Sequence, residues 1–388
     1  MSEPDPVRGL RALIERSGLR RVHVIAWRDL DDPGAGGSEL HITELARRWV
    51  AAGAEVTLLA AGVPGSASET WRHGIRVRRR GGPLTVYARN ALDEIVRRNG
   101  PCDGLVEVWH GVSFMAPLWS RVPTIGIAHH VHTEQFAMVL PGPLAAVARF
   151  LEARVYPRLY RRTPLVTLSD SVKDEFVDGL GYEAAGLTVV SPGVAAQFVP
   201  GARRADHPLV VSVGRLMPQK YAAALVDVLL EVRDRHPDLE AVLVGDGPER
   251  AAVEAQVARA GAGGWLRVAG RVDDAELVDL YRRAWVLASA SMKEGWGMTV
   301  TEAGACGTPA VVTRIPGHDG AVVDGVTGLL VSGPDDLAAG LDRLLADEDL
   351  RRRMGDAARD HAAAFTWDAA AHDTFAVLVG AAEDRRRR

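Results

Sequence analysis

Residues 293–302 read Lys-Glu-Gly-Trp-Gly-Met-Thr-Val-Thr-Glu and place two acidic residues, Glu294 and Glu302, eight positions apart. An ionised carboxylate offers about four acceptor sites to hydroxyl donors, which suits a polyhydroxylated ligand. The two glycines between the acids let the backbone approach a ligand closely, because they carry no Cβ. Thr299 and Glu302 indicate the opening of a helix, whose free N–H groups favour an anion. The stretch therefore predicts a binding site for a sugar that is attached to a phosphate.

The same residues also allow a purely structural interpretation. Thr299-x-x-Glu302 fits a capping box, in which Glu302 would satisfy the first backbone donor of the helix. Glycine pairs of this kind also mark ordinary turns. The stretch alone leaves both interpretations open.

Further glycine-rich stretches lie on either side of it. In chain order they are Gly36-Gly37-Ser38-Glu39, Gly214-Arg215-Leu216-Met217-Pro218-Gln219-Lys220, Val244-Gly245-Asp246-Gly247-Pro248, Gly270-Arg271-Val272 and Gly304-Ala305-Cys306-Gly307-Thr308-Pro309. This ordered set resembles the retaining glycosyltransferases of family 4, whose E-x7-E signature matches residues 294–302. The resemblance extends over roughly residues 20 to 370. It implies an α/β protein of the GT-B architecture, with two Rossmann-like doubly wound domains facing a central cleft.

Length and composition agree with two soluble domains. A chain of 388 residues exceeds what one hydrophobic core usually supports. Hydrophobic residues make up 47% and charged residues 25%, as in an ordinary globular protein. The formal charge of −4 carries no overall footprint of nucleic-acid binding, so we expect no nucleic-acid partner.

Compartment signals point to the cytoplasm. Cys102 and Cys306 lie in unrelated segments, without metal-ligand spacing or a disulfide framework. No apolar run reaches the roughly 18 residues of a spanning helix. The first residues, Met-Ser-Glu-Pro-Asp-Pro, lack the basic and apolar regions of a secretion signal. We therefore expect a cytoplasmic protein.

Two series of short apolar runs alternate with helical patterns, which is typical of parallel sheets covered by helices. The first series is 22–26, 55–60, 104–108, 124–128 and 165–168, and the second is 209–213, 240–244, 266–268, 285–288, 310–312 and 328–331. The polar, turn-rich stretch 198–208 separates them. We therefore predict domains at 1–198 and 199–366, and the resemblance implies that helix 367–388 packs back on the first domain. By the same resemblance, the first domain binds the acceptor and the second binds the donor.

Arg215 and Lys220 form the second informative pair. Gly214 ends a predicted strand, and Pro218 suits the first position of a helix, where its missing N–H costs nothing. Two cations oppose the positive end of a helix dipole, which is easier to understand if an anion lies between them. Arginine can bind a diphosphate through two hydrogen bonds, and lysine acts as a point charge. The alternative is an exposed basic pair. After the lysine this chain has Tyr221, where the resembled family often has glycine or a basic residue.

Gly36 and Gly37 lie between the first predicted strand and a helix expected at 38–52. Glycine at a helix N-terminus lets backbone N–H groups face a phosphate. The loop is not the G-x-G-x-x-G fingerprint of dinucleotide-binding proteins. The resemblance implies contact with the distal phosphate of the donor, and the alternative is a turn capped by Ser38.

Three histidines, His129, His130 and His132, follow the strand 124–128 and should emerge at the carboxyl edge of the sheet, where open α/β sheets bind ligands. The register matches His129 to the family histidine that contacts the transferred sugar. The other two could be packed and hydrogen-bonded. A metal site is disfavoured, because no cysteine or further histidine completes a ligand pattern.

Asp29-Leu30-Asp31 spells D-x-D, which marks a metal site in a different glycosyltransferase architecture. Here it precedes the glycine turn, in a loop of the kind where acidic residues are common. We interpret it as incidental and expect an enzyme that needs no metal.

The resemblance also implies roles for individual residues. The nucleobase would lie against the backbone of Arg271 and Val272, Glu302 would bind the ribose and Glu294 the transferred sugar. Trp296 stands where the family has phenylalanine. The residues predicted to act in catalysis are His129, Arg215, Lys220 and Glu294. Those predicted to bind the donor are Gly36, Gly37, Gly214, Arg271, Val272, Gly295, Trp296, Gly297, Met298, Thr299, Val300 and Glu302.

The predicted activity is the transfer of a sugar from a nucleotide-diphosphate donor to an acceptor hydroxyl, with retention at the anomeric carbon. No cofactor is expected, and a UDP-sugar is slightly favoured as donor. The acceptor could be a glycan, a lipid or a natural product. The alternative is a nucleotide-sugar epimerase of the same architecture, which lacks the E-x7-E arrangement. An NAD-dependent oxidoreductase would need a strand followed by G-x-G-x-x-G, and the sequence has none.

One predicted helix is strongly basic. Aromatic and aliphatic residues alternate there with Arg149, Arg154, Arg158, Arg161 and Arg162. A packed surface helix with solvated arginines is the favoured interpretation, and contact with an anionic membrane surface is the alternative.

Overall fold

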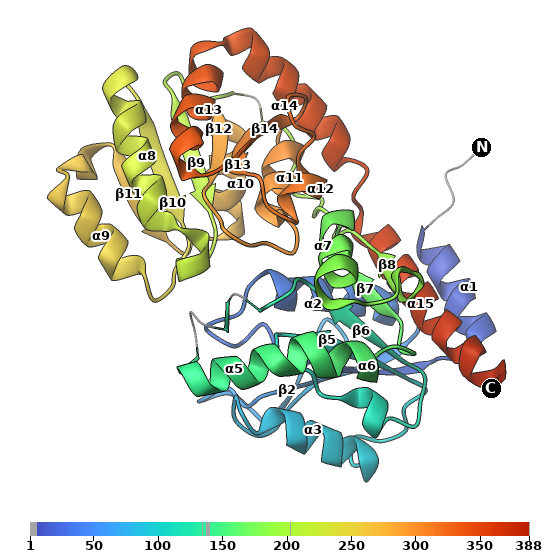
Figure 1. Ribbon diagram of the computed structural model, residues 1–388. Coiled ribbons are helices and arrows are strands. Elements are labelled where there is room, and N and C mark those ends of the chain that lie inside the picture. The colour runs from blue at the N-terminus through green and yellow to red at the C-terminus, as the bar shows by residue number, and fades with distance from the viewer. Residues whose placement is uncertain (1–5, 134, 137–139, 202, 388) are drawn as a thin grey trace. The chain divides into compact units, whose positions relative to one another are not determined.

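The computed structural model describes residues 6–133, 135–136, 140–201 and 203–387. The chain forms two compact units. The N-terminal unit comprises Met1–Gly193 together with Trp367–Arg388, and the C-terminal unit comprises Val194–Thr366 (Figure 1). The boundary between the units, at Gly193/Val194, lies a few residues before the expected boundary at 198/199. The reason is that Val194 already pairs with Phe365 and Thr366 of the C-terminal unit.

The described part of the N-terminal unit holds an eight-stranded sheet in the order β3-β4-β2-β1-β5-β6-β7-β8. Its strands are β1 Arg21–Ile25, β2 Glu55–Ala60, β3 Glu69–Arg72, β4 Ile75–Arg79, β5 Gly104–Trp109, β6 Thr124–Ala128, β7 Leu165–Thr167 and β8 Leu187–Val189. Neighbouring strands run parallel, except that β3 and β4 form an antiparallel hairpin. All six residues of β5 are buried, as expected for a strand covered on both faces.

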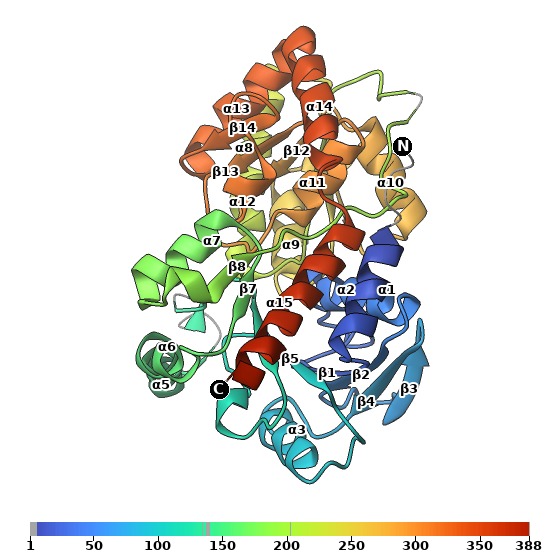
Figure 2. The same ribbon diagram turned by 90° about the vertical axis from the view of Figure 1, so that its right-hand side faces the viewer.

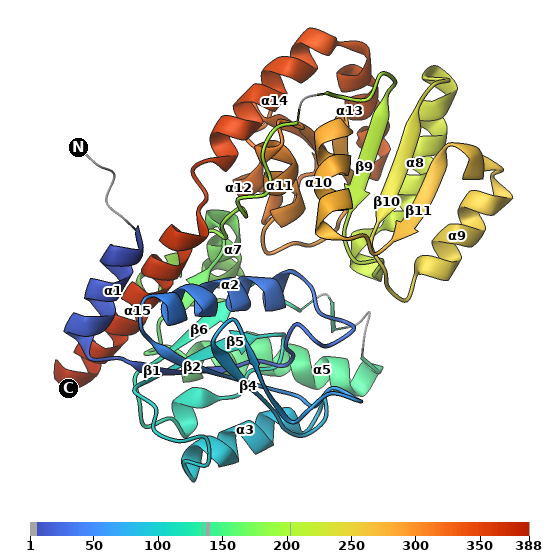
Figure 3. The same cartoon turned by 180° about the vertical axis from the view of Figure 1, so that it is seen from behind.

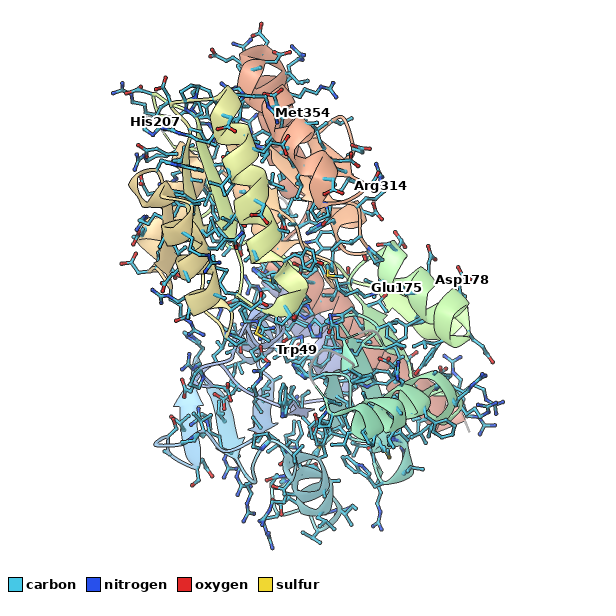
Figure 4. The ribbon with its side chains drawn as sticks, turned by 60° about the vertical axis from the view of Figure 1, so that its left-hand side comes forward. Trp49, Glu175, Asp178, His207, Arg314 and Met354 are labelled. Carbon is cyan, nitrogen blue, oxygen red and sulfur yellow. The ribbon has the colours of Figure 1, made fainter. Side chains whose placement is uncertain are left out.

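Helices cover both faces of this sheet (Figures 1 and 3). They are α1 Pro6–Ser17, α2 Gly37–Ala51, α3 Val86–Ile95, η1 Ala116–Leu118, α5 Gly142–Phe150, η2 Leu151–Val155, α6 Tyr156–Leu159, α7 Asp170–Asp174, η3 Glu175–Gly179, η4 Ala184–Gly186 and α15 Trp367–Arg387. α15 contacts α1, α2, β5 and β6. The buried Trp49 side chain of α2 (Figure 4) donates to the Ala371 carbonyl at 2.9 Å and packs edge-on against Phe375. The end of the chain is therefore part of the N-terminal core.

One long helix of this unit is interrupted by a π turn. α5 continues into η2 and α6, and the Tyr156 N–H donates to the Leu151 carbonyl, five residues back. Pro157 explains the change of register, because it has no N–H and its ring crowds the carbonyl four residues earlier. The segment keeps helical continuity across a proline by widening for one turn.

The C-terminal unit holds a six-stranded parallel sheet in the order β11-β10-β9-β12-β13-β14. Its strands are β9 Leu209–Val213, β10 Glu240–Val244, β11 Leu266–Gly270, β12 Val286–Ser289, β13 Ala310–Thr313 and β14 Gly328–Val331. Its helices are η5 Pro218–Lys220, α8 Ala222–Arg235, α9 Arg250–Arg259, η6 Ala262–Gly264, α10 Asp274–Arg283, α11 Met298–Ala305, α12 His318–Ala321, α13 Pro334–Ala346 and α14 Glu348–Ala362. α8 and α13 pack together on one face, and α10 and α11 lie on the other (Figures 1 and 3). Both units are thus doubly wound α/β sheets.

Two glycines of the C-terminal unit are required by close backbone packing. Gly245 has φ +133°, and a Cβ there would lie 1.9 Å from the Gly214 carbonyl oxygen. A Cβ on Gly247 would lie 2.3 Å from the Leu216 carbonyl oxygen. Because no larger residue fits, these glycines fix the position of the loop that follows β9.

The strand order reverses between β1 and β5 in the N-terminal unit and between β9 and β12 in the C-terminal unit. Loops after such paired strands leave in opposite directions, and ligands of open α/β sheets bind at this point, beyond the carboxyl ends of the strands. The loops that follow β1, β5, β9 and β12 are therefore the expected ligand-binding segments.

A buried carboxylate stabilises the N-terminal unit near its switch point. Glu107 on β5 is fully buried and accepts hydrogen bonds from the Tyr160 hydroxyl at 2.8 and 2.7 Å and from the Ala116 amide at 3.3 Å. Burial raises the pKa of Glu107 to about 7, and these donors oppose the rise. These hydrogen-bond donors stabilise the buried Glu107 side chain most when it is ionised.

We expect Tyr160→Phe to lower the free energy of unfolding by about 1–3 kcal/mol, because it removes a donor from a buried acceptor. The loss should be larger at pH 8 than at pH 5, since Glu107 is then ionised. Urea denaturation at both pH values measures this. Tyr182→Phe is the matched control, because the buried Tyr182 hydroxyl has no partner within the described residues. Equal losses in the two variants would contradict the role of Tyr160.

Candidate functional site

The central loops of the C-terminal unit follow the two strands at its switch point. Gly214 and Arg215 come directly after β9, and Glu294 lies in the loop after β12. The Met292 amide donates to the Gln219 carbonyl at 2.9 Å, which ties this loop to η5. The motif at 214–220 and the motif at 293–302 therefore meet at one edge of the sheet.

Lys220 and Glu294 form an ion pair across these loops. Their side chains are 23% and 16% exposed, so water screens the pair only partly. Lys220 lies against Gly214, where a Cβ would come within 3.7 Å of the lysine side chain. The structure thus brings together three of the predicted residues, and Arg215 is half-buried beside them.

The charge of Glu294 is stabilised by its surroundings. Burial would raise the pKa of this carboxyl, but the nearby charges of Lys220 and His318 and a hydrogen bond from Ser291 outweigh burial and lower it. Glu294 is therefore an ionised acceptor next to a cation. Such a pair can accept hydroxyl donors on one side and bind an anion on the other.

The helix α11 begins at Met298, with Gly297 as its N-cap residue. The interpretation of Thr299 and Glu302 as a capping box is therefore wrong, because Glu302 lies more than a full turn inside the helix. The Val300 amide donates to the Gly297 carbonyl at 2.9 Å. Within the described residues the Thr299 amide has no acceptor, so it is the amide of this turn that a ligand can use.

Glu302 accepts a hydrogen bond from the buried Tyr281 hydroxyl at 3.0 Å. Burial raises the pKa of Glu302 to about 7, and the Tyr281 hydrogen bond opposes the rise. Tyr281 was not among the predicted residues, because its position on α10 carries no sequence motif. A carboxylate that is costly to ionise and supported by one donor has capacity for further donors from a ligand.

The remaining predicted donor residues lie in the loops that follow β12 and β11. Trp296 is 6% exposed and packs edge-on against Phe365 at 5.0 Å, so the indole lines the wall of the loop and presents little of its face. Gly295 and Gly297 are buried, and a Cβ on Gly317 would lie 2.7 Å from the Glu294 carbonyl oxygen. Arg271 and Val272 follow β11, the outer strand of the sheet.

In the N-terminal unit, the glycine turn is organised by Glu39. Its carboxylate accepts from the Gly36 amide at 2.8 Å and the Ser38 hydroxyl at 3.0 Å and lies 3.2 Å from His110 Nε2. Burial opposes the ionisation of Glu39, but His110, Arg28 and the Gly36 amide outweigh burial and lower its pKa. The Gly36 amide is thus engaged, whereas the Gly37 amide has no acceptor within the described residues. α2 starts at Gly37, so Ser38 is not its cap.

His129 lies at the carboxyl end of β6, as predicted, and is 7% exposed. Its Nε2 lies 3.3 Å from Nδ1 of the fully buried His41, and its Nδ1 has no partner within the described residues. Burial and the neighbouring His41 and His110 lower the pKa of His129 well below its ordinary value. His129 is therefore a neutral imidazole with one ring nitrogen available.

The other two histidines of this loop have their own partners. His130 Nε2 lies 3.1 Å from the Gln135 side chain, and His132 lies 3.7 Å from the Glu152 carboxylate on η2. The two imidazole rings stack at 4.1 Å. They are packed and hydrogen-bonded, which was the alternative considered for them.

The D-x-D carboxylates are bound by arginines. Asp29 is 3% exposed and pairs with Arg79 at 2.7 Å, and Asp31 pairs with both Arg79 and Arg72. A bidentate arginine occupies the oxygens that a metal would need. This arrangement gives the two aspartates a structural role in holding the loop.

A group that spacing did not reveal is His23, Glu94 and Cys102, whose ligand atoms lie within 4.8 Å of one another. Burial would lower the pKa of His23, but hydrogen bonds with Cys102 and Glu94 raise it to about 9. His23 Nδ1 lies 3.0 Å from the Glu94 carboxylate, and we interpret the group as a hydrogen-bonded ion pair. The group also lies toward the amino ends of the strands, away from the candidate site.

No sequence motif identifies His41 or His110 as site residues, and the Gly36–Glu39 motif does not by itself give Glu39 a role. His110 follows β5 directly, so the rule that singled out His129 after β6 would have found it. His41 and Glu39 lie inside α2, where nothing in the periodicity distinguishes a site residue from a core residue.

We expect Glu39→Gln to lower the free energy of unfolding by about 3–5 kcal/mol, because it removes the buried carboxylate charge that pairs with Arg28. Glu44→Gln on the same helix is the control, since Glu44 pairs with Arg47 and Arg48 nearer the surface and should cost about 0–1 kcal/mol. Chemical denaturation compares the two variants. Similar losses of stability in the two variants would contradict a larger stabilising contribution from Glu39 than from Glu44.

Comparison with known proteins gives two adjoining family matches. Residues 35–198 match the model described as Glycosyltransferase Family 4, and residues 195–361 match the model described as Glycosyl transferases group 1. The chain is 32% identical to a D-inositol 3-phosphate glycosyltransferase of Kribbella flavida, over 94% of this chain and 96% of that protein. It is 30% identical to one of Streptomyces bingchenggensis, over 92% and 88%.

Solved structures share the fold. Sucrose-phosphate synthase of Thermosynechococcus elongatus superposes with a TM-score of 0.80 at 21% identity, covering 92% of this chain and 98% of that one. The Anabaena protein HepE in complex with UDP-glucose superposes with a TM-score of 0.71 at 17% identity, covering 95% and 100%. These relatives give no support to the epimerase alternative. Two doubly wound units, the ordered motifs and these matches together show that the chain is a glycosyltransferase of family 4 with the GT-B fold.

Proposed function

We propose that this glycosyltransferase moves a sugar from a nucleotide-diphosphate donor to an acceptor hydroxyl with retention at the anomeric carbon. The observation that carries the proposal is the Lys220–Glu294 ion pair at the switch point of the C-terminal unit. A cation and a carboxylate held side by side match a ligand in which a phosphate is bonded directly to a sugar that carries hydroxyl groups. The available Thr299 amide adds a second donor for the anion.

Several of the predicted residues then have a defined part. Lys220, Arg215 and the Thr299 amide bind the diphosphate, and Glu294 accepts hydroxyls of the transferred sugar. Glu302 accepts the ribose hydroxyls beside Tyr281. In the N-terminal unit, the neutral His129 offers a hydrogen bond to the sugar without adding positive charge to the reacting carbon.

The reaction needs a stabilised leaving group more than a nucleophile. The bond from the anomeric carbon to the phosphate oxygen breaks, and the acceptor oxygen bonds to the same face of that carbon. The acceptor proton passes to the departing phosphate oxygen, so charge and atoms balance without a protein base. When the donor binds, the Lys220–Glu294 ion pair is replaced by contacts of Lys220 with the phosphate and of Glu294 with the sugar hydroxyls. Preorganised charges of this kind often supply the largest single term in catalysis.

We further propose that transfer is independent of metal, and the support is the occupation of Asp29 and Asp31 by arginines. Activity should be unchanged by a chelator such as EDTA. A strict requirement for Mn²⁺ would contradict this part of the proposal.

The first donors to test are UDP-sugars, because HepE, which has the same fold, was crystallised in complex with UDP-glucose. The first acceptor to test is D-inositol 3-phosphate, because it gives the named relatives their name. Glycan, lipid and natural-product acceptors follow. A thermal-shift screen against UDP-, GDP-, ADP- and dTDP-sugars should identify one nucleotide that stabilises the protein.

Proton NMR of the product then tests the stereochemistry. We expect the anomeric configuration of the donor to be kept. An inverted product would overturn the retaining assignment, and conversion of the donor sugar without an acceptor would overturn transfer in favour of epimerisation.

A further inference from the structure

The outer face of α5 exposes three large apolar side chains. Leu144, Val147 and Phe150 are 57%, 55% and 61% exposed, and they recur every three residues along the helix. The opposite face is buried through Ala145 and Ala148. The hydrophobic stripe is therefore turned away from the core of the N-terminal unit.

The same helical segment is basic on its outer side. Its exposed arginines are Arg149, Arg154, Arg158, Arg161 and Arg162. The one acidic residue between 142 and 162 is Glu152, which is 3% exposed and faces inward. It accepts from the His132 amide at 2.8 Å and pairs with the Thr133 hydroxyl at 2.6 Å. The exposed side of this segment thus carries no carboxylate.

A second basic segment, far away in the sequence, reaches the same place. A cavity of about 310 Å³ is lined by Leu159 and Arg162 from the α6 region and by Asp384 and Arg385 from α15. The Arg385 side chain donates to the Val122 carbonyl at 3.2 Å. Figure 2 shows the end of α15 close to α6. Arg385 therefore lies at the edge of this basic surface, next to Asp384.

We propose that this α5–α6 surface, formed by Leu144, Val147, Phe150, Arg154, Arg158, Arg161 and Arg162, docks the protein on an anionic lipid bilayer. The apolar stripe enters the interfacial region, and the arginines bind anionic headgroups. Charge complementarity selects the lipid surface as the occupant, because a buried protein partner would have to pair each arginine individually. The contact is peripheral, since no helix in the described ranges is long and apolar enough to cross a membrane.

A side-chain contact links the helix that carries this surface to the loop after β6. Glu152 holds the loop that carries His132, three residues after His129, while the outer side of the same helix faces the lipid. Docking would therefore orient the N-terminal unit with this loop close to the membrane. The inference needs only the surface and does not depend on the proposed activity.

Vesicle cosedimentation tests the docking. We expect the protein to bind vesicles of phosphatidylglycerol and phosphatidylcholine at least tenfold more tightly than vesicles of phosphatidylcholine alone. The variants Leu144→Ser/Val147→Ser/Phe150→Ser and Arg154→Glu/Arg158→Glu/Arg161→Glu should each lose most of this binding. Two controls should keep it: Leu92→Ser/Val96→Ser, which changes apolar residues 58% and 61% exposed near α3, and Arg352→Glu/Arg353→Glu on α14. Circular dichroism verifies that all variants are folded.

An environment-sensitive label separates insertion from simple attraction to polyanions. Val147→Cys in a Cys102→Ser background carries an NBD fluorophore, and Cys306 is buried. We expect a blue shift with anionic vesicles for this label and none for a label at Leu92→Cys. Binding to phosphatidylcholine as tight as to anionic vesicles would overturn the proposal. So would binding to heparin and anionic vesicles without any shift at position 147, because the arginines would then act alone.

Discussion

Replacing Lys220 by alanine will reduce kcat/KM by at least 10²- to 10³-fold, the loss that follows when one preorganised donor to a developing negative charge is removed. In the free protein, Lys220 is held by Glu294 and lies against Gly214, so its position is set before the donor arrives. Alanine removes the charge and leaves Glu294 without its ion pair. Steady-state kinetics with the identified donor measures the effect.

A structural explanation of such a loss can be separated from a catalytic one. If Lys220 binds the diphosphate, the variant should bind the nucleoside diphosphate much more weakly and the nucleoside unchanged, as measured by calorimetry. Lys293→Ala is the charge-matched control, because it removes a lysine one residue before Glu294, and it should keep kcat/KM within about threefold. Near-normal turnover of Lys220→Ala would refute the phosphate role.

The fold was predictable from the sequence because its signals are local. Runs such as 209–213 and 240–244 are apolar on both sides, as buried parallel strands must be, and they became β9 and β10 with the expected connections. The boundary between the units was placed slightly late. The stretch 198–208 is polar, but Val194 had already left the first unit through a backbone pairing that composition does not record.

The site was predictable only in part. Residues next to strand ends, such as Lys220, Glu294 and His129, follow from topology, because the carboxyl edge of a parallel sheet collects them. Topology does not show which backbone donors and acceptors are available to a ligand. The Gly36 amide donates to Glu39 and the Val300 amide donates to Gly297, although both residues were predicted to bind the donor. Whether a backbone amide is available to a ligand depends on the exact residue at which the helix begins, and the sequence does not predict that residue.

Membrane contact was the less favoured interpretation of the basic helix, since sequence cannot show which apolar residues stay outside. Alternating hydrophobicity is equally typical of a helix packed on a core. The structure adds that Val147 and Phe150 are exposed on α5, and the docking proposal rests on that exposure.

The second large effect concerns Glu302 and pH. Its pKa in the free protein is about 7, so the carboxylate that should bind the ribose is only partly ionised near neutrality. We expect the dissociation constant of the donor to rise about tenfold from pH 8 to pH 6, because the ionised fraction falls from about 0.9 to about 0.1. Isothermal calorimetry across this range measures the change.

Glu302→Gln should remove this pH dependence. It should also weaken binding at pH 8 by roughly 10- to 100-fold, since a hydrogen bond to a charged acceptor contributes about 1.5–3 kcal/mol. Glu254→Gln, at an exposed position on α9, is the control and should keep both the affinity and the pH profile of the unaltered protein. A pH profile of Glu302→Gln that matches the unaltered protein would assign the titration to another group.

Stability should respond with the opposite sign. The pKa of Glu302 is higher in the folded chain than in the unfolded chain, so its contribution to stability is complete below the unfolded value and is lost as pH rises through about 7. Relative to Glu302→Gln, the unaltered protein should therefore become less stable between pH 6 and pH 8 while it binds the donor more tightly. Denaturation without ligand and calorimetry with ligand must move in opposite directions over this range. A carboxylate that only caps or packs would change stability alone, and this divergence therefore identifies Glu302 as a residue that contacts the donor.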